Sequence, residues 1–190
     1  MTIPVSIRTA LNRLVAALLL GAFGRVLLLN APPLAEGVVL RLDEAVSLFS
    51  ALALGPHWGA ITSLMATVGT PEPSYSAVWA IEALAVGVAV RGGAVPVLVA
   101  PVYWVLAYGL FASGIVATAP TDIDGRLLLA KQIVNSTLSV ALAQTLLAAP
   151  GVRDLLGIRR HEPAPPLRVQ IARAIVPVST IPVILLGLGL

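Results

Sequence analysis

Residues 127–148 read LLLAKQIVNSTLSVALAQTLLA, an almost continuous apolar helical pattern that contains Lys131, Gln132, Asn135 and Gln144. Its length fits the roughly 20 residues that a helix needs to cross the hydrocarbon of a bilayer. Polar side chains at that depth are unfavourable unless they face the interior of a bundle or a water-filled cavity, so they mark places where a membrane protein handles ligands, ions or signals. The stretch therefore predicts a membrane helix with a functional polar face.

The composition of the whole chain supports the same class. Hydrophobic residues make up 58% of the 190 residues, charged residues 11%, and the mean hydropathy is +0.96. These values exclude an ordinary soluble domain and predict an all-helical, polytopic membrane bundle. Cysteine is absent, which excludes disulfides and thiol chemistry within this sequence. The net charge of +3 is small and its basic residues collect at predicted membrane edges, so we expect no nucleic-acid partner.

Glycine, proline and polar residues divide the chain into apolar segments. We expect spans at residues 11–29, 38–54, 75–90, 95–113 and 126–149, and a short helix that ends near Gly69. The first span has no small-residue cleavage site, so it reads as a retained helix rather than a signal peptide. These six helices form one predicted domain, residues 1–150. Residues 151–168 form a basic, Pro-rich cytoplasmic connector, and residues 169–190 a seventh apolar helix, truncated or leading to further domains.

The distribution of charge predicts the orientation, because short loops rich in Lys and Arg stay in the cytoplasm. With the N-terminus inside, the inner segments hold most of the arginines and the outer segments most of the acids. The inner set is Arg8, Arg13, Arg91, Arg153, Arg159, Arg160, Arg168 and Arg173, and the outer set is Glu36, Asp43, Glu44, Glu72, Asp122 and Asp124, against Arg41 and Arg126. We therefore predict a cytoplasmic N-terminus.

Ionisable residues within the predicted spans are the first candidates for a site. Glu82 stands in the middle third of its span with no charge within one helical turn, so it needs a partner or a ligand. Arg25 and the interfacial pair Asp43 and Glu44 also lie in, or at the edge of, predicted hydrocarbon. Lys131 lies one turn inside its helix, where it either snorkels to the interface, forms a structural ion pair or contacts a ligand, and the first two readings are favoured.

Amide side chains add to this candidate site. Gln132 and Asn135 are three residues apart and Lys131 and Asn135 four apart, so all three share one helical stripe. Asn135 and Gln144 serve equally well as hydrogen-bonding groups between packed helices, and for each of them alone that reading is favoured. The convergent stripe is the better signal, and we predict a ligand-binding site formed by Glu82, Lys131, Gln132 and Asn135.

Other chemistry has no motif here. The sequence contains no phosphate-binding glycine loop of the GxxxxGK type, no HExxH and no GxSxG, so we predict no catalytic residues, no enzymatic activity and no cofactor. His57 with Trp58 reads as a cytoplasmic interface anchor rather than a metal ligand, and Tyr103, Trp104 and Tyr108 read as aromatic anchors at or near an interface.

Four motifs together resemble a known class of membrane module: LGPHWGAITSLMATVGT, YSAVWAIEALAVGVAV, APVYWVLAYG and the stretch from Leu127 to Ala148. They are similar to the N-terminal membrane-sensor module of bacterial histidine kinases and diguanylate cyclases, and also to the six-helix substrate-binding (S) subunits of energy-coupling-factor transporters. The shared features are a Gly-Pro-x-x-Gly turn between helices two and three and a Lys-Gln-x-x-Asn stripe on helix six. The likeness covers roughly residues 40–150 and implies an S-subunit-like six-helix core in a bacterial inner membrane.

The resemblance implies two functions. The favoured one is a sensory input domain that binds a small molecule from the outer side and signals to kinase or cyclase domains, because the chain continues past helix six into the predicted seventh helix. The alternative is the substrate-binding subunit of a vitamin or metal transporter, partnered by an ATPase module. For that role, small residues of the first helix would dock the partner, namely Ala16, Ala17, Gly21, Ala22 and Gly24. A structural membrane protein, whose polar stripe only holds helices together, is a third possibility.

Overall fold

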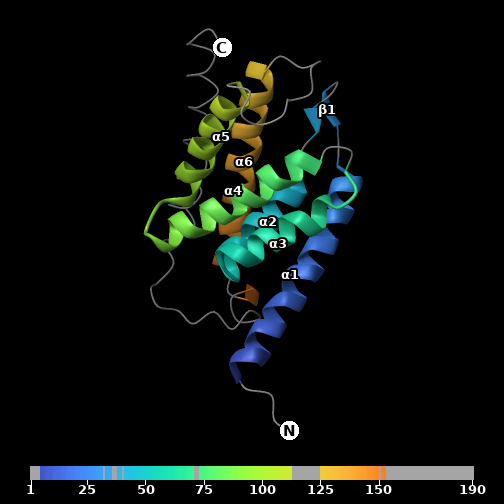
Figure 1. Ribbon diagram of the computed structural model, residues 1–190, viewed down its shortest axis with the longest axis vertical. Coiled ribbons are helices and arrows are strands. Elements are labelled where there is room, and N and C mark those ends of the chain that lie inside the picture. The colour runs from blue at the N-terminus through green and yellow to red at the C-terminus, as the bar shows by residue number, and fades with distance from the viewer. Residues whose placement is uncertain are drawn as a thin grey trace.

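The computed structural model describes residues 5–31, 33–35, 38–39, 41–70, 73–112, 125–149 and 151–152. These residues form a helical bundle with one small β-ribbon, which confirms the predicted all-α class (Figure 1). The elements are α1 (Val5–Leu29), β1 (Pro33–Ala35), β2 (Val38–Val39), α2 (Leu42–Ala53), α3 (Pro56–Thr67), α4 (Pro73–Arg91), α5 (Pro96–Ala112) and α6 (Gly125–Ala148). The predicted connector, apart from residues 151–152, and the predicted seventh helix lie outside the described residues.

The second predicted span differs most from the structure. Its first two residues, Val38 and Val39, form strand β2, which pairs with β1 in an antiparallel ribbon: Pro33 pairs with Val39 and Ala35 with Val38. Helix α2 therefore begins only at Leu42. Over so few positions, a pattern of apolar residues fits a helix and a strand equally well. At 12 residues, α2 and α3 each rise about 18 Å, whereas the hydrocarbon of a bilayer is about 30 Å thick. Neither helix alone has the length of a span.

The Gly-Pro-x-x-Gly motif forms the turn between α2 and α3 and lets the two helices pack closely. Gly55 has φ of 123°, a backbone conformation that favours glycine, and Pro56 occupies the first turn of α3, where its missing N–H is not needed. A Cβ on Gly59 would lie 2.4 Å from the Cβ of Ala51, so only glycine lets the two short helices approach this closely. The two helices therefore pack tightly together.

Helix α2 lies at the centre of the bundle, where it contacts α1, α3, α4 and α6, while α5 packs on α4 and α6. The main apolar core joins α2, α4, α5 and α6 and consists of Leu48, Phe49, Ala51, Ala83, Val86, Val97, Ala100, Val140 and Ala143. Figure 1 shows the N-terminus at one end of the molecule, with β1 and the first turns of α6 at the opposite end. The beginning of α2 therefore lies toward the end away from the N-terminus.

Helix α1 packs on α3 through small residues. A Cβ on Gly21 would lie 2.6 Å from the Cβ of Met65, and one on Gly24 would lie 3.1 Å from the Cβ of Ala66. The buried Thr62 hydroxyl donates to the Ala17 carbonyl oxygen at 3.1 Å and is hydrogen-bonded to Ser50 Oγ at 2.8 Å. These contacts place the small face of α1 inside the bundle.

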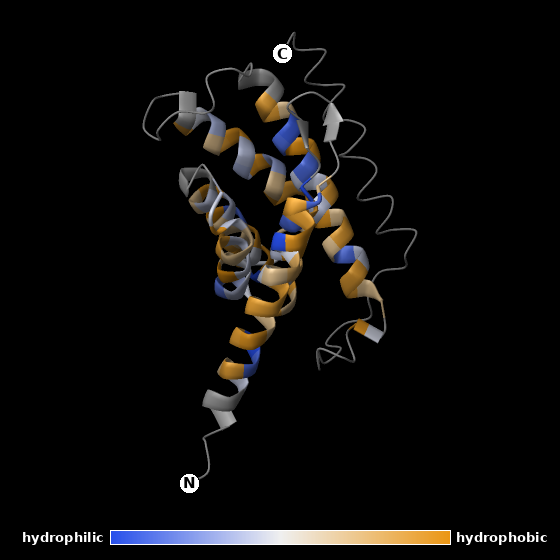
Figure 2. Ribbon diagram, turned by 90° about the vertical axis from the view of Figure 1, so that its right-hand side faces the viewer, coloured by the Kyte–Doolittle hydropathy of each residue, from blue (hydrophilic) through white to orange (hydrophobic). Residues whose placement is uncertain are grey.

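The outside of the bundle is apolar. Leu19, Leu29 and Leu106 are 67%, 68% and 65% exposed, and large aliphatic side chains are also exposed on α3, α4 and α6. Figure 2 shows hydrophobic residues along the outer helices, α1 in particular. In the part of the chain that the structure describes, one stretch, Thr9–Leu29, has both the length and the hydropathy of a membrane span, and Pro96–Leu110 is apolar but shorter.

Candidate functional site

A cluster of buried polar side chains lies where the beginning of α2 meets α4, α5 and α6. Three of its ionisable residues are almost inaccessible: Asp43 at 1%, Glu44 at 4% and Glu82 at 1% exposure. Arg41, Gln132, Asn135 and Ser136 are buried beside them. Burying so many polar groups is unfavourable unless each is paired, so the pairing of each group shows what the cluster does.

Arg41 neutralises one carboxylate and stacks on an aromatic ring. Its Nε donates to Asp43 Oδ1 at 3.1 Å, and Nη2 donates to Asp43 Oδ2 in a second bond that completes a bidentate ion pair. Its guanidinium carbon lies 3.3 Å from the centroid of the Trp79 ring on α4. Such stacking and two-point pairing suit the planar guanidinium group and stabilise a charge away from water.

Asn135 joins α6 to the beginning of α2. Its Oδ1 accepts the backbone N–H of Arg41 at 3.0 Å, and its Nδ2 donates to Glu44 Oε2 at 2.6 Å. Both ends of the amide are thus used inside the bundle. Asn135 accordingly positions Glu44 and holds the helix pair together.

Glu82 is paired with neutral donors. Its Oε1 accepts Nε1 of Trp104 on α5 at 2.8 Å and also accepts the hydroxyl of Ser136 on α6. Tyr103, the neighbour of Trp104, donates from its hydroxyl to the Val78 carbonyl at 2.6 Å. These bonds tie α4 to α5 and α6 at the level of the cluster.

Two acceptor atoms of the cluster have no hydrogen-bond partner among the described residues: Glu44 Oε1 and Gln132 Oε1. Gln132 is only 3% exposed and lies one turn before Asn135 on the same face of α6. Since Asn135 is bonded to Glu44, both open acceptors belong to one wall between α2 and α6. A buried acceptor without a partner costs about 1–3 kcal/mol relative to a paired one.

The charges of the cluster do not balance through Arg41 alone. Glu44 interacts electrostatically with Glu82, Asp43 and Arg41, and Lys131 interacts with Glu44 and Arg41 from a half-buried position on α6. Three carboxylates thus face one buried arginine and one half-buried lysine. In the described residues no group of three or more His, Cys, Asp or Glu side chains has the geometry to hold a metal ion.

The four predicted site residues lie on facing parts of the bundle. Glu82, Gln132 and Asn135 are buried in the cluster, and Lys131 lies at its margin. Sequence reasoning missed the contribution of Arg41 and treated Asp43 and Glu44 only as an interfacial pair; all three are buried in the cluster. Trp104 is also different from the prediction, because it is 3% exposed and binds Glu82 instead of anchoring an interface.

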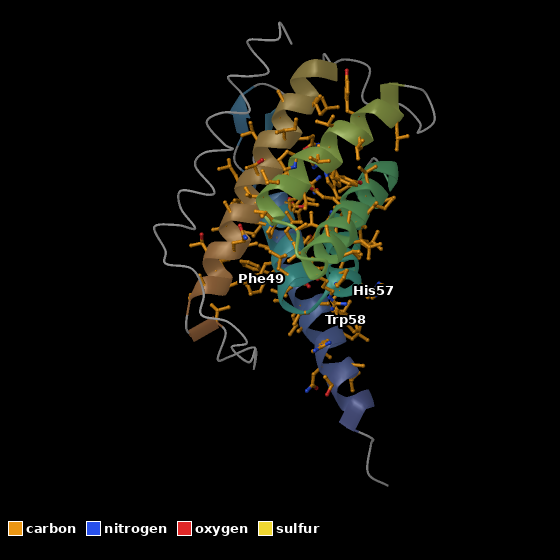
Figure 3. The ribbon with its side chains drawn as sticks, turned by 90° about the vertical axis from the view of Figure 1, so that its left-hand side faces the viewer. Phe49, His57 and Trp58 are labelled. Carbon is orange, nitrogen blue, oxygen red and sulfur yellow. The ribbon has the colours of Figure 1, made fainter. Side chains whose placement is uncertain are left out.

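A separate cavity of about 210 Å³ lies between α1, α2 and α6, on the other face of α2. Its lining is apolar throughout and includes Phe23, Phe49 and Leu146. Figure 3 shows Phe49 well apart from His57 and Trp58, the pair predicted as an interface anchor, which lie in the first turn of α3. His57 is exposed and Trp58 half-buried.

Comparison with known proteins gives no family for this chain. No protein-family model matches it, and neither a curated protein nor a solved structure is significantly similar to it. The resemblance to sensor modules and transporter S subunits therefore stays a prediction from the four sequence motifs.

Proposed function

We propose that this chain is the membrane-embedded input domain of a bacterial signalling protein, which binds a small molecule from the outer side and transmits the change to a kinase or cyclase output. The observation that carries the proposal is the pair of open acceptors, Glu44 Oε1 and Gln132 Oε1, in a cluster whose other groups are largely paired. A cluster that only held helices together would gain by pairing these atoms as well. A ligand that donates hydrogen bonds satisfies them.

The inverted polarity of the bundle supports a multi-pass membrane location. Large apolar side chains cover the outside, while Arg41, Asp43, Glu44 and Glu82 are buried. In water, an exposed apolar surface of this extent would promote association, whereas in lipid it is the favourable arrangement. The short helices α2 and α3 then form a hairpin closed by Gly55, in which α2 lies within the bundle and α3 turns exposed apolar side chains such as Leu64 toward lipid.

The position of the cluster supports access from the outer side. Arg41, Asp43 and Glu44 stand at the beginning of α2, and Lys131 and Gln132 in the first half of α6. The positive-inside rule assigns both helix beginnings to the outer side. A ligand of the cluster therefore enters from the side opposite the predicted cytoplasmic loops.

A ligand at this site has a direct structural route to the rest of the bundle. Glu44 lies on α2 and Gln132 on α6, and α2 also contacts α1, α3 and α4. Binding that favours one arrangement of α2 against α6 shifts the population of the whole bundle by the difference in affinity between the two arrangements. This is the physical basis of a sensory input.

The transporter alternative loses part of its sequence support. Of the five small residues proposed to dock an ATPase partner, Ala17, Gly21 and Gly24 are buried; all three lie against α3, and Gly24 also lies against Asp43 of α2. Ala16 is half-buried and Ala22 exposed, and these two remain for a partner. Neighbouring genes for a pair of ATPases would favour transport, and a kinase or cyclase continuing the reading frame would favour sensing.

Native mass spectrometry of the full chain, purified gently in detergent, tests ligand binding. We expect a stoichiometric small molecule with the unmodified chain and with the control Gln144→Leu, and its loss with Gln132→Leu. Gln144 is the matched control because it is a half-buried amide on the same helix, away from the cluster. No bound molecule in any sample, with equal thermal stability of both glutamine variants, would overturn the proposal.

Transmission requires a separate measurement. The absence of cysteine allows spin labels at two introduced cysteines, Leu64→Cys on α3 and Leu142→Cys on α6, both exposed positions. We expect the distance distribution between the labels to differ between the ligand-retaining chain and the Gln132→Leu variant. Identical distributions would contradict a sensory role and leave ligand capture alone.

A further inference from the structure

The open acceptors also define the chemistry of the ligand. Resting on the proposed function, we infer that the site between α2 and α6 binds an organic cation with N–H donors, of the primary ammonium or guanidinium class. Gln132 Oε1 accepts hydrogen bonds and cannot donate them, and Glu44 Oε1 does the same in the ionised carboxylate that a bound cation would stabilise. A ligand that satisfies both must therefore carry at least two donors.

The charge of the cluster selects a cationic donor over a neutral one. Asp43 is paired with Arg41 in a two-point ion pair, but Glu44 has only the neutral amide of Asn135, and Glu82 only Trp104 and Ser136. Glu44 and Glu82 also repel each other. An additional positive charge against Glu44 relieves that repulsion and compensates a buried carboxylate.

Lys131 does not supply this charge from within the cluster. It is half-buried at the margin, and Glu44 Oε1 has no hydrogen bond from it or from any other described residue. Arg41 has its guanidinium group bound to Asp43 and stacked on Trp79. The two basic residues at the cluster, Arg41 and Lys131, thus leave the open acceptors of Glu44 and Gln132 unfilled.

The surroundings distinguish among cations. A metal ion is disfavoured because no group of three His, Cys, Asp or Glu side chains with ligating geometry occurs in the described residues. A quaternary ammonium ion has no N–H donor and is bound instead by aromatic faces. The face of Trp79 is covered by Arg41, and Trp104 is buried with its Nε1 bonded to Glu82. A primary ammonium or guanidinium head remains.

The test uses the full chain in lipid nanodiscs and follows thermal unfolding by tryptophan fluorescence. The probes are n-butylammonium, tetramethylammonium and sodium chlorides and sodium butyrate, all at the same ionic strength. We expect n-butylammonium to raise Tm by about 2 °C or more at saturation and the other three salts to have no effect beyond that of ionic strength. An equal shift with tetramethylammonium, or none with n-butylammonium, overturns the inference without the need for any variant.

Variants locate the effect. Glu44→Gln keeps an oxygen acceptor for Asn135 and removes the charge, so the n-butylammonium shift should be lost, as it should in Gln132→Leu. Gln144→Leu should keep the full shift. A shift that persists in both Glu44→Gln and Gln132→Leu overturns the location of the site.

The inference and the proposed function can fail separately. A co-purified neutral or anionic molecule that is lost in Gln132→Leu but kept in Gln144→Leu would overturn the cation class and leave the proposed function standing. A co-purified amine or guanidine with the same dependence supports both. No co-purified molecule and no n-butylammonium shift would overturn both.

Discussion

The side-chain amide of Asn135 on α6 donates to Glu44 Oε2 on α2 at 2.6 Å, across 91 residues of sequence, while its oxygen accepts the Arg41 backbone N–H at 3.0 Å. One side chain thus fixes both the backbone entry into α2 and the orientation of a buried carboxylate. Glu44 is held with its second oxygen, Oε1, left open. This relationship makes Asn135 a positioning residue for the proposed ligand.

Replacement of Asn135 should destabilise the bundle. Asn135→Leu removes both hydrogen bonds and leaves the Arg41 N–H and Glu44 Oε2 buried without partners, so we expect a loss of about 3 kcal/mol in unfolding free energy. The measurement is unfolding in nanodiscs. The control is Thr145→Val, which removes an exposed bond to the Ala141 carbonyl in the same helix and should change stability by less than about 0.5 kcal/mol. Equal stability of the two variants would show that the hydrogen bonds of Asn135 do not contribute to the stability of the bundle.

Two substitutions of Glu82 test whether its contribution to stability comes from its hydrogen-bond acceptor or from its charge. Glu82→Leu leaves Trp104 Nε1 and the Ser136 hydroxyl unpaired, whereas Glu82→Gln keeps one oxygen that accepts from both, as Oε1 of Glu82 does. We expect Glu82→Leu to be less stable than Glu82→Gln by about 2 kcal/mol. A double-mutant cycle of Glu82→Leu and Trp104→Phe should give a coupling energy of about 1 kcal/mol. Additive effects would contradict the observed hydrogen bond.

Even a conservative replacement of Arg41 should lower the unfolding free energy of the bundle. Lysine cannot make the two-point pair with Asp43 and stack on Trp79 at the same time, so Arg41→Lys should cost about 1–3 kcal/mol. Arg41→Met leaves Asp43 as a buried, uncompensated charge and should cost about 3–5 kcal/mol. The double variant Arg41→Met with Asp43→Leu should recover part of that loss. A double variant no more stable than Arg41→Met would contradict the pairing.

Most helices were predictable because apolar runs and their glycine and proline boundaries act locally. The predicted spans at residues 11–29, 75–90, 95–113 and 126–149 overlap α1, α4, α5 and α6 almost throughout. The ribbon at residues 33–39 was missed, since two- and three-residue strands depend on pairing and not on a periodic pattern. The length of α2 was overestimated for that reason.

The candidate site was predictable only in part. Glu82, Gln132 and Asn135 stood out because polar residues in an apolar helix are conspicuous. Asp43 and Glu44 stood out only as an interfacial pair, and Arg41 did not, because charges next to a loop normally read as solvated. Their burial depends on the fold, which places the beginning of α2 against α4 and α6. The partner of Glu82 was likewise unpredictable, since Trp104 lies 22 residues away on another helix.

Glycine substitutions should separate close packing from helix propensity. A Cβ on Gly59 would lie 2.7 Å from the Cα of Ala51, and one on Gly87 would lie 2.8 Å from the Cα of Pro56, both backbone atoms that cannot move away alone. Gly59→Ala and Gly87→Ala should each lower stability, by about 1–3 kcal/mol. The control Gly109→Ala meets nothing within 4 Å in α5 and should raise stability by about 0.5–1 kcal/mol. A neutral Gly59→Ala would contradict the tight packing of α2 on α3.

The proposed topology makes a prediction about accessibility from the two sides of the membrane. Single cysteines at Asn30 and His57, both exposed, should label from opposite sides, since the chain has no cysteine of its own. In right-side-out vesicles a membrane-impermeant maleimide should modify Asn30→Cys but leave His57→Cys unmodified until the vesicles are opened. Ala17→Cys, buried against α3, serves as the unreactive control in both conditions. Reaction of His57→Cys from outside, or of both sites from the same side, would contradict the crossing of α1 and the cytoplasmic position of the turn between α2 and α3, and with them the access of ligands to Glu44 from the outer side.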